Sequence, residues 1–423
     1  MRRDEVGVDK FQARYQVHEY PGRKPWYVVR KYVEGCSEPG DVVLDPFCGS
    51  GVVPCESLIM RRRAVAFDID PLAIFISKMT CTSPIDLEKL ERVFGQVERM
   101  AKNAVYKLYT LEEMCPVCGE HLVISSAARM PDVQQVNVKA ICPVCGKFHN
   151  LTSDLQDWRD GAGEPIPYWY PRDVELPAGI RGNICYLHEL YTTRNLAALS
   201  ILWHEINLAE DEAHRDMLRL CFSATLSKAA KINVPKSTGK GWTTADYEAY
   251  NIPDNFIEFN VWDGFSNKFY LLLEAKAQTN QLIGDFYASP KSADILNRSA
   301  DDLSLIEDNS IDYALTDPPY ADLVRYFERN FVRNTWLGFD DEYPLKEYSE
   351  MMPGALREIH RVLKPGRHLS VLLRSTSQQF RDEFVDMAEK AGVTYESTDT
   401  EHLGYTNAHH EPADHILNFV NSE

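Results

Sequence analysis

The four residues Asp317-Pro318-Pro319-Tyr320 combine a carboxylate, a stiffened backbone and an aromatic ring. An exocyclic amine on an aromatic base is a poor nucleophile, because its lone pair is delocalised into the ring. A carboxylate and a backbone carbonyl that each accept one N–H would favour a more tetrahedral nitrogen, and the prolines hold that carbonyl in place. The Tyr320 ring can stack on a base taken out of a duplex. The motif predicts an amine-activating site, although the same residues also suit an ordinary turn after a strand.

A second motif lies near the start of the chain, where Gly49 and Gly51 interrupt an apolar region. A glycine-rich turn between a strand and a helix lets a ligand approach the backbone and presents helix N–H groups to an anion. Asp68, at the end of the next predicted strand, can accept hydrogen bonds from two ribose hydroxyls. These features predict a nucleotide-type cofactor. The third glycine of a dinucleotide fingerprint is missing, and a plain tight turn remains the alternative.

Both motifs follow short apolar runs, which predict strands that end at the two sites. The first part of the chain has a strand–turn–helix–strand pattern, and the pattern resumes after residue 310. Together these segments predict a doubly wound α/β sheet. The predicted strands are residues 41–45, 64–67, 310–316, 369–373 and 415–420, and the predicted helices include residues 52–62, 348–363 and 379–391.

The residues between the two halves have a different character, with paired cysteines, a Pro- and aromatic-rich loop and helical segments. An insertion within one α/β domain explains this order better than two consecutive domains. We therefore expect a catalytic domain made of residues 1–84 and 297–423, interrupted by an α+β insert of residues 85–296. Within the insert, a zinc ribbon is expected at about residues 112–150 and a target-recognition region at residues 151–296.

Four of the ten cysteines form two Cys-Pro-Val-Cys-Gly repeats, with cysteines at 115, 118, 142 and 145. Tetrahedral zinc takes four such ligands, and each repeat supplies two thiolates from one tight turn. The sequence therefore predicts a structural zinc ion held by Cys115, Cys118, Cys142 and Cys145. A redox pair, an incomplete ligand set, or replacement of one ligand by His121 or His149 are the alternatives.

The segment Asp45-Pro46-Phe47-Cys48-Gly49-Ser50-Gly51 resembles the cofactor motif of S-adenosylmethionine-dependent amino-methyltransferases that act on nucleic-acid bases. Arg23-Lys24-Pro25, before an amphipathic segment, resembles the region that these enzymes place over the methionine end of the cofactor. Phe67-Asp68-Ile69-Asp70-Pro71 resembles their ribose-binding segment. The resemblance implies a Rossmann-like class I methyltransferase sheet. It also implies S-adenosylmethionine contacts from Lys24, Pro25, Asp45, Pro46, Phe47, Cys48, Gly49, Gly51, Asp68 and Ile69.

The motif Asp317-Pro318-Pro319-Tyr320 is similar to the catalytic motif of DNA adenine-N6 and cytosine-N4 methyltransferases, and of some RNA methyltransferases. Aspartate in the first place favours adenine, because the cytosine enzymes more often carry serine there. The resemblance implies a site-specific enzyme that transfers a methyl group to adenine N6 in duplex DNA with a flipped base. It is also compatible with a restriction or defence protein as a partner. A cytosine-N4 or RNA enzyme, and a non-catalytic zinc-ribbon or cofactor-binding subunit, are the alternatives.

The net charge of −18 does not favour nucleic acid as a partner, because phosphate contacts need Lys and Arg. A local basic surface can nevertheless lie on an acidic protein. The stretch from 223 to 245 contains lysines without acids, and we expect phosphate contacts there from Lys228, Lys231, Lys236 and Lys240 beside the aromatic Trp242, although a solvated face is the alternative. No apolar run is long enough for a membrane span and no signal peptide is visible, so a cytoplasmic protein is expected.

Overall fold

The computed structural model describes residues 12–158, 165–177, 182–236, 241–244, 250–286, 292–319, 326–339, 347–373, 377–401 and 414–422. The chain divides into two compact units, one made of residues 1–85, 275–325 and 339–423, the other of residues 86–274 and 326–338. Among the described helices, none is both long enough and apolar enough to cross a membrane.

The first unit is built on a seven-stranded sheet with the order β10-β2-β1-β11-β12-β14-β13. Strands β10, β2, β1, β11 and β12 run parallel, and β14 is antiparallel to both β12 and β13. The predicted Rossmann-like α/β sheet is therefore confirmed. The strands are β1 (Val42–Asp45), β2 (Arg63–Asp68), β10 (Ala293–Asn297), β11 (Ile311–Thr316), β12 (Leu363–Leu373), β13 (Thr394–Glu401) and β14 (Asp414–Val420).

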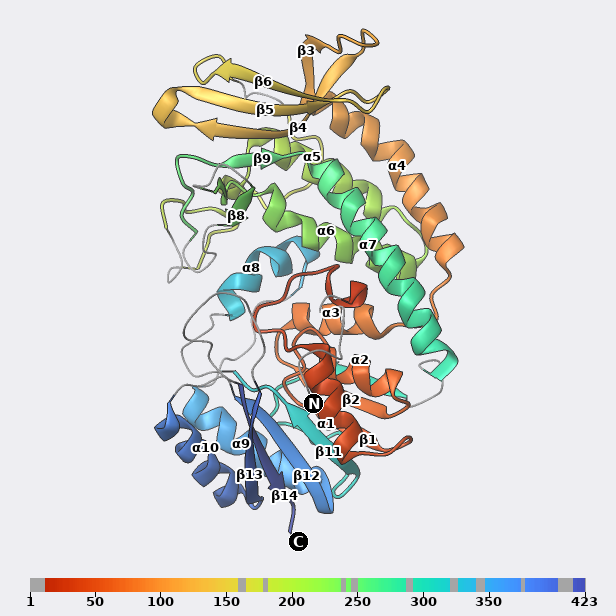
Figure 1. The fold of residues 1–423 in the computed structure, drawn as a ribbon, viewed down its shortest axis with the longest axis vertical. Coiled ribbons are helices and arrows are strands. Elements are labelled where there is room, and N and C mark those ends of the chain that lie inside the picture. Colours follow the sequence, from red (N-terminus) through yellow and green to blue (C-terminus); the bar gives the residue numbers. More distant parts are fainter. Residues whose placement is uncertain are drawn as a thin grey trace, which may run out of the picture. The chain divides into compact units, whose positions relative to one another are not determined.

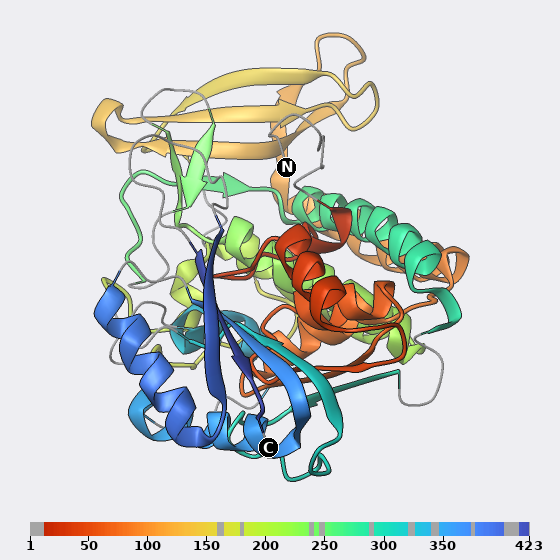
Figure 2. The same cartoon turned by 60° about the horizontal axis from the view of Figure 1, so that its bottom comes forward.

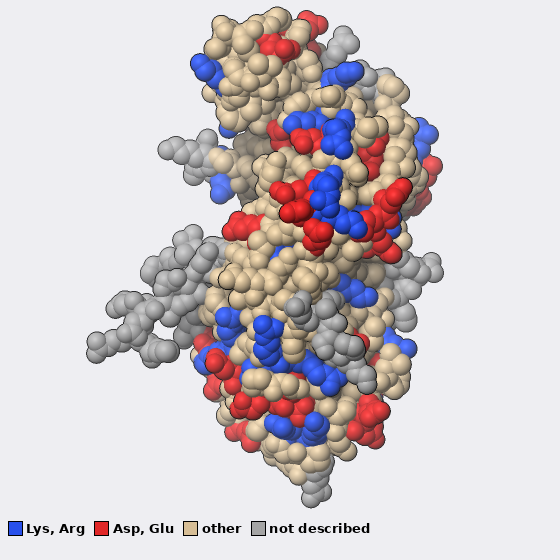
Figure 3. All heavy atoms as spheres, turned by 90° about the vertical axis from the view of Figure 1, so that its right-hand side faces the viewer, with Lys and Arg blue, Asp and Glu red and all other residues tan. Residues whose placement is uncertain are grey.

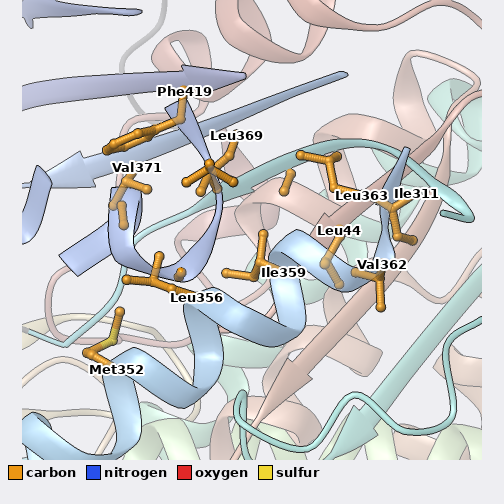
Figure 4. Packing of buried hydrophobic residues seen from close by; sticks show 14 of the residues in the cluster. Leu44, Ile311, Met352, Leu356, Ile359, Val362, Leu363, Leu369, Val371 and Phe419 are labelled. Carbon is orange, nitrogen blue, oxygen red and sulfur yellow. The ribbon is translucent and has the colours of Figure 1, made fainter. Parts of the chain in front are cut away.

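Helices cover both faces of this sheet, as Figures 1 and 2 show. Helices α1 (Trp26–Cys36), α2 (Val52–Ile59) and α3 (Pro71–Cys81) pack on one face, and α9 (Tyr348–Val362) and α10 (Gln378–Ala391) pack on the other. All six residues of β11 are buried, as expected for a parallel strand covered on both sides. Alternate residues of this strand enter different cores: Tyr313 and Leu315 pack with α1, and Ala314 lies in the cluster with α9 drawn in Figure 4.

The strand order reverses between β1 and β11, which are neighbours in the sheet. In a doubly wound sheet, ligands bind outside the carboxyl ends of the strands at such a switch point. The parallel register places Leu44 opposite Ala314, so Asp45 and Thr316 reach the same edge. Asp317 follows β11 directly, and Asp68 ends β2 beside β1. Three residues predicted for catalysis or cofactor binding therefore lie along one edge of the sheet.

The second unit combines helices with a five-stranded antiparallel sheet in which β3, β4, β5 and β6 are consecutive and β9 pairs with β4. The aromatic rings of Phe94 and Phe269 stack face to face, with centroids 3.7 Å apart, and pack α4 against α7. A two-stranded hairpin is formed by β7 and β8. The elements are α4 (Leu87–Tyr109), β3 (Thr110–Met114), β4 (His121–Met130), β5 (Gln135–Ile141), β6 (Phe148–Asp154), α5 (Thr193–Asn207), α6 (Glu212–Ala229), β7 (Asn233–Pro235), β8 (Trp242–Thr244), β9 (Ile257–Phe259), α7 (Val261–Leu282) and α8 (Tyr326–Leu337).

The units differ in extent from the catalytic domain and insert expected from the sequence. The end of α7 and strand β10 belong to the first unit, because β10 pairs with β2 and Ile283 and Ile295 enter its core. Helix α8 belongs to the second unit, where the fully buried Trp336 packs against Phe222. The expected insert of residues 85–296 therefore corresponds only approximately to the second unit. The division into a catalytic domain and an insert remains a proposal.

Candidate active site and cysteine cluster

The turn between β1 and α2 has the backbone conformation that its glycines allow. Gly49 and Gly51 have φ angles of +49° and +80°, in the left-handed region that favours glycine. The backbone N–H of Cys48 donates to the carbonyl of Phe67 at 2.9 Å, and that of Gly49 donates to Asp68 Oδ2 at 2.8 Å. These bonds tie the turn to the end of β2, so the predicted cofactor turn and the predicted ribose-binding carboxylate form one structure.

Replacing Gly51 with alanine is expected to destabilise the first unit by about 2–4 kcal/mol, from left-handed backbone strain and steric overlap. A Cβ at this position would lie 2.3 Å from Ser77 Oγ and 2.8 Å from Ser77 Cα, so backbone as well as side chain must move. Gly40→Ala is the matched control, because Gly40 has a φ of +96° but nothing within 4 Å of its Cβ position. Urea denaturation should show a clearly larger loss for G51A than for G40A; equal losses would contradict the steric argument.

The segment before α1 is fastened to this turn by hydrogen bonds from charged side chains, of which Arg23 is half-buried. Arg23 donates from Nε to Ser50 Oγ at 2.8 Å and from Nη2 to the carbonyl of His18 at 2.8 Å. Nearby, the fully buried carboxylate of Glu56 on α2 accepts hydrogen bonds from Arg14, Tyr15 and Arg30. Hydrogen-bonded buried charges of this kind fix geometry. They explain how the Arg23-Lys24-Pro25 segment is held beside the glycine turn.

Asp68 is organised by backbone donors on both of its oxygens. Oδ2 accepts from Gly49 N at 2.8 Å and Oδ1 accepts from Asp70 N at 2.9 Å. Burial raises the pKa of Asp68 to about 7; the nearby Asp70 carboxylate adds to the rise, and the backbone hydrogen bonds oppose it. Each carboxylate oxygen has two lone pairs, so Asp68 has the capacity to accept further hydrogen bonds from a ligand's hydroxyls. The side chain of Asn297 donates to the carbonyls of Asp68 and Ile69, which fixes the backbone at this point.

Asp45 lies at the end of β1 with only 3% of its surface exposed. Its Oδ1 accepts from Thr316 Oγ1 at 2.7 Å and from Phe47 N at 3.2 Å, so the carboxyl group links β1, the glycine turn and β11. Burial raises the pKa of Asp45 to about 8; the two hydrogen bonds oppose the rise, and the neighbouring Asp317 and Asp68 carboxylates add to it.

The pKa of Asp45 makes a specific pH dependence expected for the ligand-free protein. Well below the ordinary pKa of 3.8 the group is protonated in both the folded and the unfolded chain, so its contribution to stability is complete. Between the ordinary pKa of 3.8 and about 8, the unfolded chain ionises first, and the free energy of unfolding falls by at most about 1.4 kcal/mol per pH unit. Asp45→Asn keeps the acceptor for Thr316 without the titration. Denaturation from pH 5 to 9 should show the wild type losing stability relative to D45N, and parallel curves would contradict the assignment.

Asp317 lies beside two charged residues that come from distant parts of the chain. The ammonium of Lys24 is 3.3 Å from Asp317 Oδ1 and 3.2 Å from Asp414 Oδ2. The Asp414 and Lys24 side chains are 1% and 8% exposed, whereas Asp317 is 20% exposed. The structure therefore places Lys24 between the predicted catalytic carboxylate and a buried acid on β14.

Some site residues could not be identified from the sequence, and one residue of the predicted catalytic motif lies outside the described residues. Asp317, Pro318 and Pro319 follow β11 as expected, but Tyr320 lies outside the described residues. Asp414 and Thr316 were not predicted. Thr316 could have been noticed as the polar residue directly before the Asp-Pro-Pro motif, but no local pattern marks Asp414, which is 390 residues from its partner Lys24.

The four predicted zinc ligands come together in the second unit, with sulfur atoms that all lie within 4.8 Å of one another. The two Cys-Pro-Val-Cys-Gly repeats, called knuckles below, have the same backbone pattern. The first cysteine accepts from the glycine four residues on, at 2.9 Å in each case, and Gly119 and Gly146 have φ angles of +73° and +70°. A backbone hydrogen bond from Cys145 to Cys142 Sγ lowers the pKa of the Cys142 thiol to about 6. His149 Nε2 lies 3.6 Å from Cys115 Sγ, beside the cluster. The four thiols could therefore hold a metal ion.

The predicted phosphate contacts differ in exposure. Lys228 is partly buried, with its ammonium 5.0 Å from the ring centroid of Phe259, and burial lowers its pKa. Lys236 is exposed, Lys231 is half-buried, and Lys240 lies outside the described residues. Trp242 is 38% exposed and packs on Phe259. On the face shown in Figure 3, basic and acidic residues are interspersed. Lys236 and Trp242 are the better placed of these residues for contact with a ligand.

Residues 5–79 match the family model of N6/N4-type DNA methylases. This segment contains the Arg23-Lys24-Pro25 region, the glycine turn and Asp68, and it ends well before the Asp-Pro-Pro motif. The resemblance to DNA amino-methyltransferases inferred from the sequence is confirmed for this part of the chain. None of the curated proteins gives a significant sequence match.

Solved structures similar to the chain include several methyltransferases. A TehB-like SAM-dependent methyltransferase from Corynebacterium glutamicum is 8% identical, with a TM-score of 0.31, over 93% of this chain and 87% of that one. A candidate rRNA methylase from Clostridium thermocellum is 9% identical, with a TM-score of 0.31, over 93% and 95%. A candidate DNA modification methylase from Thermus thermophilus is 15% identical, with a TM-score of 0.20, over 30% of this chain and 52% of that one. Similarities at this level say nothing about a shared substrate.

Proposed function

We propose that this chain transfers a methyl group from S-adenosylmethionine to the exocyclic amine of a nucleic-acid base, adenine N6 in DNA being the preferred target. The observation that carries the proposal is the meeting of Asp45, Asp68, Asp317 and Lys24 along the carboxyl edge of the sheet at its switch point. The match of residues 5–79 to the DNA methylase family supports the same activity.

The residues present fit the proposed cofactor. The glycine turn lets a ligand approach the backbone, and Asp68 can accept hydrogen bonds from ribose hydroxyls. The Asp68 carboxylate contributes to the raised pKa of Asp45, and a positively charged cofactor beside the two groups would favour their ionised forms. S-adenosylmethionine supplies an electrophilic methyl group on a positively charged sulfur. Pro46, Phe47 and Cys48 belong to the same turn, Pro25 caps α1 and Ile69 follows Asp68; these five residues complete the predicted binding set.

In the proposed reaction the chain's own contribution is to position and activate the amine. Asp317 accepts one N–H of the amine, and the backbone carbonyl held by Pro318 accepts the other. The nitrogen lone pair then forms a bond to the methyl carbon while the carbon–sulfur bond breaks, and the nitrogen loses a proton toward Asp317. Such an in-line displacement depends mainly on alignment of the reacting atoms. Tyr320 is proposed to stack on the flipped base.

We further propose that Cys115, Cys118, Cys142 and Cys145 bind structural Zn²⁺. A tetrahedral zinc ion with four thiolates about 2.3 Å away requires sulfur atoms about 3.8 Å apart. The pairs Cys115–Cys145 and Cys118–Cys142 have sulfur distances of 3.6 and 3.4 Å, which are close to this requirement and longer than a disulfide bond. Four protein ligands complete the coordination, so the zinc would stabilise the β3–β6 sheet and take no part in catalysis.

The proposed activity is tested by incubating the purified protein with methyl-labelled S-adenosylmethionine and either duplex DNA or RNA, followed by digestion to nucleosides. N6-methyl-2′-deoxyadenosine from DNA is the expected product. N4-methyl-2′-deoxycytidine from DNA would keep the activity and correct the base, which the family match also allows. Label confined to RNA would overturn DNA as the substrate. Cofactor binding without transfer to either would favour a non-catalytic subunit. Duplexes of varied sequence would then define the recognition site.

A further inference from the structure

The charged contacts around Lys24 give it a role different from the one its sequence position implies. Its ammonium is 3.3 Å from Asp317 and 3.2 Å from Asp414. A lysine that only covered the methionine end of a cofactor would not need two protein carboxylates. We propose that Asp414 is a positioning residue: it anchors Lys24, and Lys24 in turn orients the carboxylate of Asp317 toward the target amine. This inference rests on the proposed function.

Asp414 is suited to act as an anchor. It is the first residue of β14, which pairs with β12 on one side and with β13 on the other. Its side chain is 1% exposed, so removal of its charged partner would leave a buried carboxylate uncompensated. Lys24 is similarly restrained, since Arg23 is bonded to Ser50 and Pro25 begins α1 as its N-cap. Both members of the anchoring pair are therefore fixed by rigid structure.

Asp317 needs such an anchor, because its backbone alone does not fix its carboxylate. The strand β11 and the two following prolines restrict the main chain, but rotation about the side-chain bonds remains. The ammonium of Lys24 faces Oδ1, and we assign Oδ2 as the acceptor for the N–H of the amine. Rotation of the carboxylate would weaken this hydrogen bond and misalign the nitrogen lone pair, to which an in-line reaction is highly sensitive.

The test compares Asp414→Asn with a matched buried acid that lies elsewhere on the same sheet. Asp312 is the second residue of β11, is 6% exposed and pairs with Lys364 at 2.6 Å, but it lies toward the opposite end of the strand from Asp317. Asp312→Asn is expected to lower the thermal midpoint and to leave kcat unchanged. D414N is expected to lower kcat by about 10- to 100-fold, with the Kd for S-adenosylmethionine and the KM for DNA within about threefold of wild type.

A double-mutant cycle separates positioning from a general structural effect. Lys24→Gln should lower kcat as much as D414N does, and the double variant should show no further loss, because Asp414 acts through Lys24. If D414N does not fold, K24Q still tests the proposal, since a cofactor-binding lysine would raise the Kd for S-adenosylmethionine and a positioning lysine would lower kcat. Wild-type kcat in folded D414N, or additive losses in the cycle, would overturn the inference while leaving the activity intact. Absence of methyl transfer by the wild type would instead overturn the proposed function, and this inference with it.

Discussion

Replacing Asp317 with alanine is expected to lower kcat for methyl transfer by about 10³-fold and to leave S-adenosylmethionine binding nearly unchanged. The carboxylate is the group proposed to bind the amine in the reacting geometry, so its loss affects the transition state. The fold should persist because Asp317 is partly exposed and Lys24 retains its partner Asp414. Single-turnover rates with duplex DNA and calorimetric titration of the cofactor measure the two effects separately.

The matched control for D317A removes a surface carboxylate from the same unit. Asp302 is 55% exposed and forms a surface ion pair with Arg298, so Asp302→Ala should keep the wild-type rate. An active D317A variant, with kcat within tenfold of the control, would remove Asp317 from the proposed mechanism. A variant that loses cofactor binding to the same extent as activity would indicate that Asp317 holds the cofactor instead.

The sequence was sufficient where the structure depends on short-range patterns. The apolar runs before Asp45 and Asp317 predicted β1 and β11, because parallel strands buried on both faces read as continuous apolar segments. The glycine turn and the cysteine knuckles were equally clear. In both knuckles a glycine with positive φ follows the second cysteine directly, so the local sequence specifies the local fold.

The remaining features depend on contacts between residues far apart in the sequence. Nothing near Asp414 indicates that it shares Lys24 with Asp317, since that contact exists only once β14 has paired with β12. The boundaries of the two units could not be predicted from the sequence either, because one of them falls inside the continuous helix α7. Lys228 was expected at a phosphate-binding surface, but tertiary packing places its ammonium over Phe259. Charge and propensity are local properties, whereas burial is set by the whole fold.

Removal of zinc is expected to destabilise the sheet formed by β3–β6. Purified protein should contain about one zinc ion per chain, and Cys142→Ser should abolish the bound metal. The sheet has limited other support at the cluster, because Val117 and Val144, at the tips of the knuckles, are 56% and 69% exposed. Metal binding and folding are coupled in such sites, so a strong chelator should lower the thermal midpoint of the second unit by about 5–10 °C.

Cys185→Ser provides the control for this experiment, because Cys185 is an exposed thiol of the same unit that lies outside the cysteine cluster. It should retain full zinc content and the wild-type midpoint. A substitution in either knuckle should release the zinc, because each knuckle supplies two of the four thiolates and one knuckle alone leaves the coordination incomplete. Cys118→Ser should therefore lose zinc as C142S does. Protein that contains no metal, and whose midpoint does not respond to chelator, would show that packing against β9 and α4 is enough to hold the sheet.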